Sequence, residues 1–254
     1  MAASHLFSFI IPYRHRADRI INLRRVIDWV SGFGGVEIIV VEQDRSPKLD
    51  SLTFKGIKYI FTKSDIPFNK SWAFNVGLKN STTETVVFGD CDLIMDPNKM
   101  IDALKSLDKY ECVSPYSRVI DLEPNEVNLN ISQMDSINRP GRGETDIQKI
   151  CLAGGIIMYR RESINKIGGW SEDFIGWGGE DDFQSHKSKA LLNCYEQMGT
   201  KCYHLWHERG APEQSYYQRN LELLNKLVAL PLQDLVSYNS NSSSKNGMKN
   251  KYER

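Results

Sequence analysis

Three acidic residues in a row, Glu180, Asp181 and Asp182, follow the glycine-rich segment GWGG at residues 176–179. Adjacent carboxylates repel one another, so a chain keeps them together where solvent, a helix N-terminus or a bound ligand offsets the repulsion. A carboxylate held in this way can act as a general base toward an attacking hydroxyl group. The simpler alternative is that the run only caps the N-terminus of a helix.

A second acidic pair, Asp90 and Asp92, comes just after the apolar run at residues 85–88. Residues i and i+2 of an extended segment point the same way, so both carboxylates are expected on one side. Two such carboxylates suit a hard divalent cation, Mg²⁺ or Mn²⁺, that also bridges phosphate oxygens. A polar turn before the next helix is the alternative, because Asp is a common turn residue.

Two histidines, His204 and His207, lie three residues apart near the end of a short apolar segment. Two imidazoles at this spacing can converge on one cation if the chain turns there. The pattern is weak by itself, because two histidines packed beside Trp206 would give the same spacing.

The elements that must position these residues form an α/β pattern. Continuous apolar runs at residues 6–11 and 36–41 predict buried strands, and the spacing of apolar residues at 18–30 predicts a helix between them. A strand, a helix and a strand at this spacing form a βαβ unit, so a parallel sheet with right-handed crossovers is expected. Ligands of such sheets bind beyond the carboxyl ends of the strands. Asp90 and the loop PYRHR at 12–16 follow such ends.

The rest of the chain continues this pattern, with two interruptions. Residues 117–149 show no sustained periodicity and predict a long binding loop. Residues 237–254 are polar and of low complexity, which predicts a disordered tail after one domain at residues 1–236. Further strands are predicted at residues 57–61, 85–88, 112–115, 150–159 and 201–206, and further helices at 69–78, 98–107, 162–167, 180–198 and 214–230.

The composition excludes several classes of protein. The 254 residues include 32 basic and 32 acidic ones, so no global field attracts nucleic acid or an anionic membrane. No apolar run is long enough to span a membrane, and the N-terminus lacks the features of a signal peptide. The five cysteines are scattered and lack CxxC spacing, which argues against a disulfide framework or a zinc site. A reducing cytoplasm fits best.

Together and in this order, the motifs resemble those of the β-1,4-galactosyltransferase family and the related bacterial chondroitin polymerase and polypeptide N-acetylgalactosaminyltransferase domains. The resemblance implies the GT-A fold: a single α/β, Rossmann-like domain with a mixed, mostly parallel sheet flanked by helices. A donor-binding half would lie at about 6–115 and an acceptor and catalytic half at about 150–236. The blocks that carry the resemblance are IIPYRHR at 10–16, FNKSWAFNVGL at 68–78, FGDCDLI at 88–94, AGGIIM at 153–158, IGWGGEDD at 175–182 and the segment at 204–209.

The resemblance also implies a donor site for a sugar linked to uridine diphosphate. Arg14 and Arg16 look like the residues near the base and the phosphates, and Trp177 resembles the tryptophan of a loop that closes over the donor. The donor-binding residues expected on this basis are Pro12, Arg14, Arg16, Asp44, Asn75, Asp90, Gly155 and Trp177.

The remaining roles concern the metal and the reaction. Asp92 resembles the direct metal ligand of the DxD motif, and the family's late Met-x-x-His segment is here His204-x-x-His207, so these three residues are expected to hold Mn²⁺, with Mg²⁺ as the alternative. Asp181 resembles the catalytic base and Glu180 a residue that positions the sugars. One base opposite the leaving group implies a single displacement with inversion, and a metal offsets the charge of the leaving diphosphate.

Departures from the family narrow the expected setting. The animal enzymes have a membrane anchor and disulfides that are not evident here, so we expect a bacterial, cytoplasmic protein that at most touches the inner face of the membrane. Leu152 stands where galactose-transferring members have a tyrosine, which leaves the donor sugar open between galactose and N-acetylgalactosamine. The expected acceptor is a saccharide, free or lipid-linked, as in surface polysaccharide synthesis, and residues 117–149 are expected to select it.

Two other functions compete with this hypothesis. A nucleotidyltransferase also binds nucleotides with paired aspartates, but it would have a Gly-rich loop with a Lys after the first strand, and residues 12–16 contain neither. A sugar-binding module without catalysis is the second alternative. The presence of Asp90, Asp92, Asp181 and both histidines argues against it.

Overall fold

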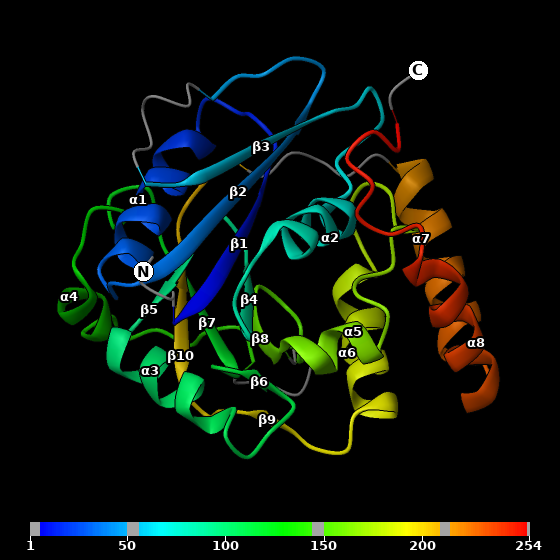
Figure 1. Ribbon diagram of the computed structural model, residues 1–254. Coiled ribbons are helices and arrows are strands. Elements are labelled where there is room, and N and C mark those ends of the chain that lie inside the picture. The colour runs from blue at the N-terminus through cyan, green and yellow to red at the C-terminus, as the bar shows by residue number, and fades with distance from the viewer. Residues whose placement is uncertain (1–5, 50–55, 144–149, 209–213, 253–254) are drawn as a thin grey trace, which may run out of the picture.

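The computed structural model describes residues 6–49, 56–143, 150–208 and 214–252. Within these residues the strands form a seven-stranded sheet in the order β3-β2-β1-β4-β8-β6-β9 and a three-stranded sheet in the order β5-β10-β7. Helices cover both faces of the larger sheet (Figure 1). The arrangement is a single α/β domain, as the sequence predicts.

The larger sheet is mostly parallel. Its strands are β1 (Phe7–Tyr13), β2 (Val36–Asp44), β3 (Lys58–Lys63), β4 (Thr85–Gly89), β6 (Cys112–Ser114), β8 (Ile156–Arg160) and β9 (Tyr195–Gln197). Strands β1 to β4 pair in parallel, whereas β8 runs antiparallel to both β4 and β6. The carboxyl ends of β1, β2 and β4 therefore meet at one edge, where the predicted site residues follow them.

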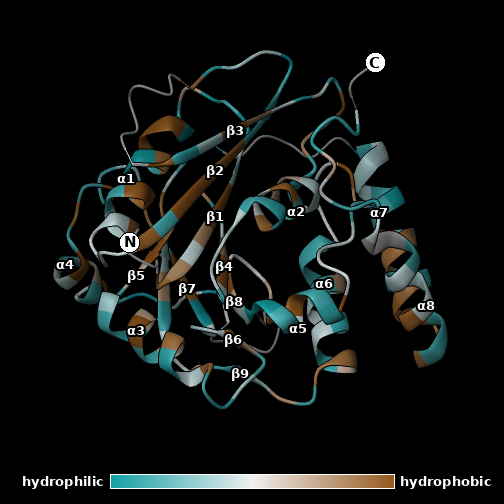
Figure 2. Cartoon of the chain, in the orientation of Figure 1, coloured by the Kyte–Doolittle hydropathy of each residue, from teal (hydrophilic) through white to brown (hydrophobic). Residues whose placement is uncertain are grey.

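Two apolar layers hold this sheet. On β1, Phe9 and Ile11 face α1 (Arg19–Ser31) and α3 (Pro97–Ser106), whereas Ile10 faces α2 (Lys70–Asn80) on the other side. Figure 2 shows apolar residues along the central strands and polar ones on the outer sides of the helices. This alternation is what a sheet buried on both faces requires. The second face is also covered by α5 (Arg161–Lys166) and α6 (Glu180–Leu191).

The smaller sheet joins distant parts of the sequence. Strand β10 (Lys201–His204) lies between β5 (Leu93–Met95) and β7 (Arg118–Asp121). In its register, His204 lies opposite Leu93 on one side and Asp121 on the other. Because β5 begins one residue after Asp92, this pairing brings His204 and His207 close to Asp92.

Two predictions of local structure are wrong. The helix expected to run from 180 to 198 ends at Leu191, and residues 195–197 form β9, because pairing with β6 at the sheet edge outweighs their helical pattern. Strand β8 starts at Ile156 rather than at 150, since a turn with Gly155 at φ +95° precedes it.

The predicted loop at 117–149 contains regular structure. It forms β7 and α4 (Ile131–Asp135), whose N-terminus carries a capping box between Asn130 and Gln133. Strand β7 has four residues and α4 has five, so neither is long enough to give a sustained period in the sequence. Residues 144–149 of this segment, and residue 209 of the motif at 204–209, lie outside the described residues.

The disordered tail predicted at 237–254 is also wrong for the residues that the structure describes. Helix α7 (Gln214–Val228) is followed by α8 (Leu232–Ser243), and the chain then returns along α2 (Figure 1). There the Trp72 indole donates to the Met248 carbonyl at 2.8 Å, and Tyr252 packs edge-on against Trp72. Hydrogen bonds and aromatic packing against α2 hold this segment, and its polar composition alone does not reveal these contacts. None of the helices in the described residues is both long and apolar enough to cross a membrane.

Candidate functional site

The turn after β4 places the acidic pair. The backbone N–H of Asp90 donates to the carbonyl of Gly155 at 3.1 Å. A Cβ on Gly155 would lie 2.3 Å from the hydroxyl of the buried Tyr116, and its φ is +95°, so only glycine fits there. Residues 91–92 form a turn rather than the extended segment expected, and the two carboxylates contact different groups. Asp90 lies beside Lys70, whereas Asp92 lies beside the histidines.

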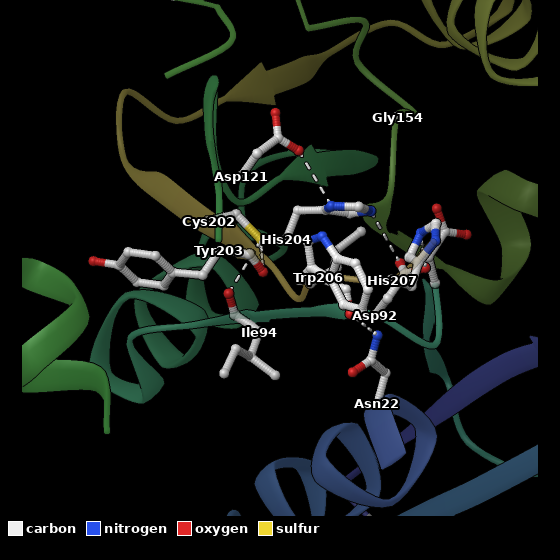
Figure 3. Close-up of polar contacts among 12 residues, drawn as sticks. Asn22, Asp92, Ile94, Asp121, Gly154, Cys202, Tyr203, His204, Trp206 and His207 are labelled. Carbon is white, nitrogen blue, oxygen red and sulfur yellow. Dashed lines mark hydrogen bonds and ion pairs between the residues drawn. The ribbon is translucent and has the colours of Figure 1, made fainter. Parts of the chain in front are cut away.

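Asp92, His204 and His207 form a cluster whose ligand atoms all lie within 4.8 Å of one another. The Nε2 atom of His207 is 3.3 Å from Asp92 Oδ2, and the Nε2 atom of His204 is 3.8 Å from Asp92 Oδ1. Figure 3 shows both rings turned toward the Asp92 carboxylate. The sequence predicted these three residues as one metal site, and the structure brings them together.

The chemistry of this cluster fits a divalent metal ion. Burial opposes the ionisation of Asp92, but the hydrogen bond from His207 and the nearby charges of His204 and Arg19 lower its pKa to about 2. The same hydrogen bond is the main cause of the raised pKa of His207. A cation would take the place of the proton that now pairs His207 with Asp92, and one carboxylate with two imidazoles is a donor set that first-row divalent metals accept.

Each histidine uses its other ring nitrogen to contact the protein. His204 Nδ1 lies 3.2 Å from Asp121 Oδ1, and His207 Nδ1 lies 3.0 Å from the carbonyl oxygen of Glu208. Metal-ligating histidines commonly donate their second N–H to a carboxylate or a carbonyl in this way. Both rings therefore present Nε2 toward Asp92.

A second cluster surrounds Lys70, which the sequence did not single out. The Lys70 ammonium lies 2.7 Å from Asp181 Oδ1 and 3.5 Å from oxygens of both Asp90 and Glu180. Its place is set by Asn69, whose side chain caps α2 at Trp72 N and whose backbone N–H donates to Gln43 at 2.7 Å. Lys70 lies inside the motif FNKS, so position in a motif was the only signal available for it.

The glycine-rich segment at residues 176–179 places Glu180 and Asp181 beside Lys70. Gly179 precedes α6 with φ +86°, and the Gly178 N–H donates to the Glu180 carboxylate at 3.0 Å. Burial raises the pKa of Asp181 to about 8; Lys70 opposes this shift, and Glu180 and Asp90 add to it. The N-terminus of α6 favours the ionised carboxylate, but burial outweighs this effect at Asp181.

Most of the predicted donor residues lie near the carboxyl edge of the larger sheet, and Asn75, which is buried in α2, is the exception. The Arg14 guanidinium donates to the Ile66 carbonyl at 2.8 Å, and Arg16 pairs with Asp18 at 3.1 Å. Asn75 is buried and bonded to Trp170 and Glu172, so this geometry does not support a contact between its side chain and the donor. Among the others, Pro12 lies on β1, Asp44 ends β2, and Gly155 precedes β8.

Trp177, the predicted lid residue, is 63% exposed. Its ring stacks on that of Tyr217 from α7, with the centroids 5.3 Å apart. Tyr217 was missed by the sequence reasoning, because nothing in the pattern of α7 distinguishes it from other surface residues.

Solved structures with a similar fold are glycosyltransferases. TarS 1–349 from S. aureus is 16% identical, covering 94% of this chain and 72% of its own, with a TM-score of 0.56. The mannosyltransferase PcManGT from Pyrobaculum calidifontis, in complex with GDP-Man and Mn²⁺, is 15% identical over 94% of this chain and 74% of its own, with a TM-score of 0.53. The catalytic domain of Drosophila β1,4-galactosyltransferase 7, in complex with xylobiose, is 17% identical over 85% of this chain and 79% of its own, with a TM-score of 0.50.

These similarities show that the fold is the GT-A fold of glycosyltransferases, as the resemblance implied. The model of the glycosyl transferase family 2 matches residues 8–168, more than half of the chain, so the protein belongs to this family. A second model, described as the N-terminal domain of galactosyltransferase, matches residues 145–195, which include the acidic run. No curated protein sequence matches the chain significantly. The family membership sets aside the nucleotidyltransferase alternative.

Proposed function

We propose that this glycosyltransferase is metal-dependent and moves galactose or N-acetylgalactosamine from uridine diphosphate to a saccharide hydroxyl, with inversion at the anomeric carbon. The observation that carries the proposal is the pair of neighbouring clusters at one sheet edge. Asp92 lies in a potential metal site with two histidines, and two residues earlier Asp90 lies with Asp181 around Lys70. The metal that stabilises the leaving group and the carboxylate that acts as the base would thus lie next to each other.

In this proposal the metal is Mn²⁺, held by Asp92, His204 and His207. When bound, such an ion offsets the negative charge that develops on the leaving diphosphate. Two imidazole ligands favour Mn²⁺ over Mg²⁺, because Mg²⁺ prefers oxygen ligands in proteins. PcManGT, a fold relative, was solved with Mn²⁺, which supports this choice.

Asp181 is the proposed base. As the acceptor oxygen attacks the anomeric carbon, its proton passes to the Asp181 carboxylate, and the bond from that carbon to the diphosphate oxygen breaks. A raised pKa makes Asp181 a stronger base than a solvated carboxylate. Lys70 orients Asp181 through its ion pair, and Glu180 lies where it can position a sugar hydroxyl.

Arg14 and Arg16 are proposed to approach the donor diphosphate, since they follow β1 at the carboxyl edge. The partial match to the galactosyltransferase model and the similarity to a galactosyltransferase fold support a galactose-type donor. A TarS structure in complex with UDP-GlcNAc supports tolerance of an N-acetyl group within this fold.

The proposed setting is the bacterial cytoplasm, at the inner face of the membrane, with a saccharide or lipid-linked saccharide acceptor of surface polysaccharide synthesis. All five cysteines are free, which fits a reducing compartment. Residues 6–115 are proposed as the donor half and 150–236 as the acceptor half.

The test is to incubate the purified protein with Mn²⁺, a panel of nucleotide sugars and saccharide acceptors, and to follow release of the nucleoside diphosphate. Asp92→Ala should weaken Mn²⁺ and donor binding together. Asp181→Asn should abolish transfer while donor binding persists. The matched control is Asp182→Asn, an exposed carboxylate in the same run, which should keep most of the activity.

Two results would overturn the proposal. Absence of turnover with every uridine-diphosphate sugar refutes the donor class, and absence of turnover with every nucleotide sugar leaves the inactive sugar-binding module as the better description. Full activity of Asp181→Asn refutes the assignment of the base.

A further inference from the structure

Asp121, at the end of β7, lies directly behind one of the two histidines. In the parallel pairing of β7 with β10, Asp121 is the partner of His204. The Asp121 Oδ1 atom is 3.2 Å from Nδ1 of His204, and the opposite ring nitrogen, Nε2, faces Asp92 (Figure 3). The histidine thus lies between two carboxylates, one on each side of its ring.

The Asp121 carboxylate is itself held by Arg142. The Arg142 guanidinium contacts both oxygens, with Nε at 2.9 Å from Oδ2 and a terminal nitrogen at 3.1 Å from Oδ1. Such a two-point contact fixes the carboxylate plane. The backbone of Arg142 also exchanges two hydrogen bonds with Val119, at 2.9 and 2.8 Å, and Arg139 donates to the Asp121 carbonyl at 2.6 Å.

The backbone around Arg142 has little freedom to move. A Cβ on Gly141 would lie 2.7 Å from the Val119 carbonyl oxygen. Gly143 has φ +94°, a conformation that other residues rarely adopt. Both neighbours of Arg142 are therefore glycines required by close packing or by the backbone conformation, and the segment that carries Arg142 is built against β7.

A neutral imidazole that ligates a metal through Nε2 must carry its proton on Nδ1. A fixed acceptor at Nδ1 selects this tautomer and sets the plane of the ring, and loss of such an acceptor typically lowers metal affinity about 10- to 100-fold. For His207 the backbone carbonyl of Glu208 supplies the acceptor, and no side-chain substitution removes it. For His204 the acceptor is a side chain and can be removed.

We propose that Asp121 is a positioning residue of the metal site: it holds His204 with its proton on Nδ1 and its Nε2 free for the metal, and Arg142 in turn holds Asp121. The inference rests on the proposed metal dependence. It gives the segment at 117–143 a role in the metal site, in addition to any contact with an acceptor.

The test measures Mn²⁺ binding rather than turnover. Purified wild type and Asp121→Ala are titrated with Mn²⁺, with and without uridine diphosphate, and free Mn²⁺ is followed by its electron paramagnetic resonance signal. We expect Asp121→Ala to bind Mn²⁺ about 10- to 100-fold more weakly. In Asp121→Asn the amide oxygen can still accept a hydrogen bond from His204 Nδ1, so this variant should lose less Mn²⁺ affinity.

The matched control is Asp135→Ala. Asp135 also belongs to this segment, and its carboxylate accepts a hydrogen bond from Tyr203 of β10 at 2.5 Å, one residue before His204. Its loss loosens the same contact between the segment and β10 but leaves His204 Nδ1 paired. Asp135→Ala should therefore keep wild-type Mn²⁺ affinity, and an equal loss in both variants would overturn the proposal by showing that Asp121 only stabilises the segment.

A second readout needs no metal. The chain has five histidines, so long-range ¹H–¹⁵N spectra can resolve the His204 ring, with His204→Gln for assignment. We expect the Nδ1–H tautomer in wild type and in Asp135→Ala, and a mixture of tautomers in Asp121→Ala. If wild type binds no Mn²⁺, both the metal dependence and this inference fail. If wild type binds Mn²⁺ and Asp121→Ala binds it equally well with an unchanged tautomer, only this inference fails.

Discussion

Lys70 allows a sharp test of the proposed base. Its ammonium is the only positive charge that the structure places within ion-pair distance of Asp181 among the described residues, and it favours the ionised carboxylate. The groups that oppose ionisation are Glu180 and Asp90, together with burial. Lys70→Met removes the favourable charge and keeps a side chain of similar length, so the pKa of Asp181 should rise further.

The size of the shift follows from the geometry. At 2.7 Å and an effective dielectric constant of about 20, one ion pair is worth on the order of 6 kcal/mol. The Asp181 side chain is 25% exposed, and solvent screens an ion pair at such a site, so about a third of this value is expected. Roughly 2 kcal/mol corresponds to about 1.5 pKa units, which would move the Asp181 pKa from about 8 to roughly 9.5.

The assay is the pH dependence of kcat/KM from about pH 6 to about pH 10, which reports the free enzyme. The base must be ionised to act, so activity is lost as the pH falls below its pKa. In Lys70→Met the acid limb should move to higher pH by about 1.5 units, and activity at pH 7 should fall roughly thirtyfold.

Two control variants accompany this measurement. Lys70→Arg keeps the charge and should shift the limb little. Lys79→Met removes an exposed lysine from the same helix and should shift nothing. An acid limb that stays in place in Lys70→Met, or one that moves to lower pH, refutes Asp181 as the titrating base.

Two further predictions concern stability. Gly155→Ala places a Cβ 2.3 Å from the Tyr116 hydroxyl at φ +95°, so we expect a loss of about 2 kcal/mol or more in the free energy of unfolding, measured in urea. Gly199→Ala, where no atom lies within 4 Å of the added Cβ, should cost far less. Lys251→Met removes the ammonium that lies 2.7 Å from the buried Glu172 carboxylate, and should lower the free energy of unfolding by about 1 to 3 kcal/mol. The exposed Lys249→Met serves as its control, and equal stability of the two variants would show that the ordered C-terminal segment contributes nothing through this pair.

Much of the larger sheet could be predicted because its signals are local. The runs at β1, β2 and β4 are continuous and apolar, and the helix that follows β1 has a clear apolar face, so sequence spacing alone predicted a parallel βαβ unit. The segments that were mispredicted have weak local signals. Strand β9 has three residues and depends on its pairing with β6, and β7 is ordered by β10 from about 80 residues later in the chain.

The same distinction applies to the site. The grouping of Asp92, His204 and His207 was implied by the resemblance to a known family, because the spacing of the two histidines is a weak signal by itself, and the structure brings the three residues together. Lys70 and Asp121 act through what they contact, and ordinary lysines and aspartates on a surface look the same in a sequence. The prediction that Asn75 contacts the donor finds no support for the opposite reason. Asn75 lies in a motif that suggests a ligand contact, but its side chain is hydrogen-bonded to Trp170 and Glu172 inside the protein.

Asp90 and Asp92 contact different groups, so the negative charges of this site are paired in two separate clusters. In the structure, Asp92 is balanced by the two histidines, whereas Asp90, Glu180 and Asp181 share Lys70. The metal ligands and the base therefore have separate positive partners, although Asp90 and Asp92 are only two residues apart. Since each partner can be substituted alone, loss of Mn²⁺ binding and a shift of the acid limb should appear in different variants, which is the behaviour that two distinct clusters require.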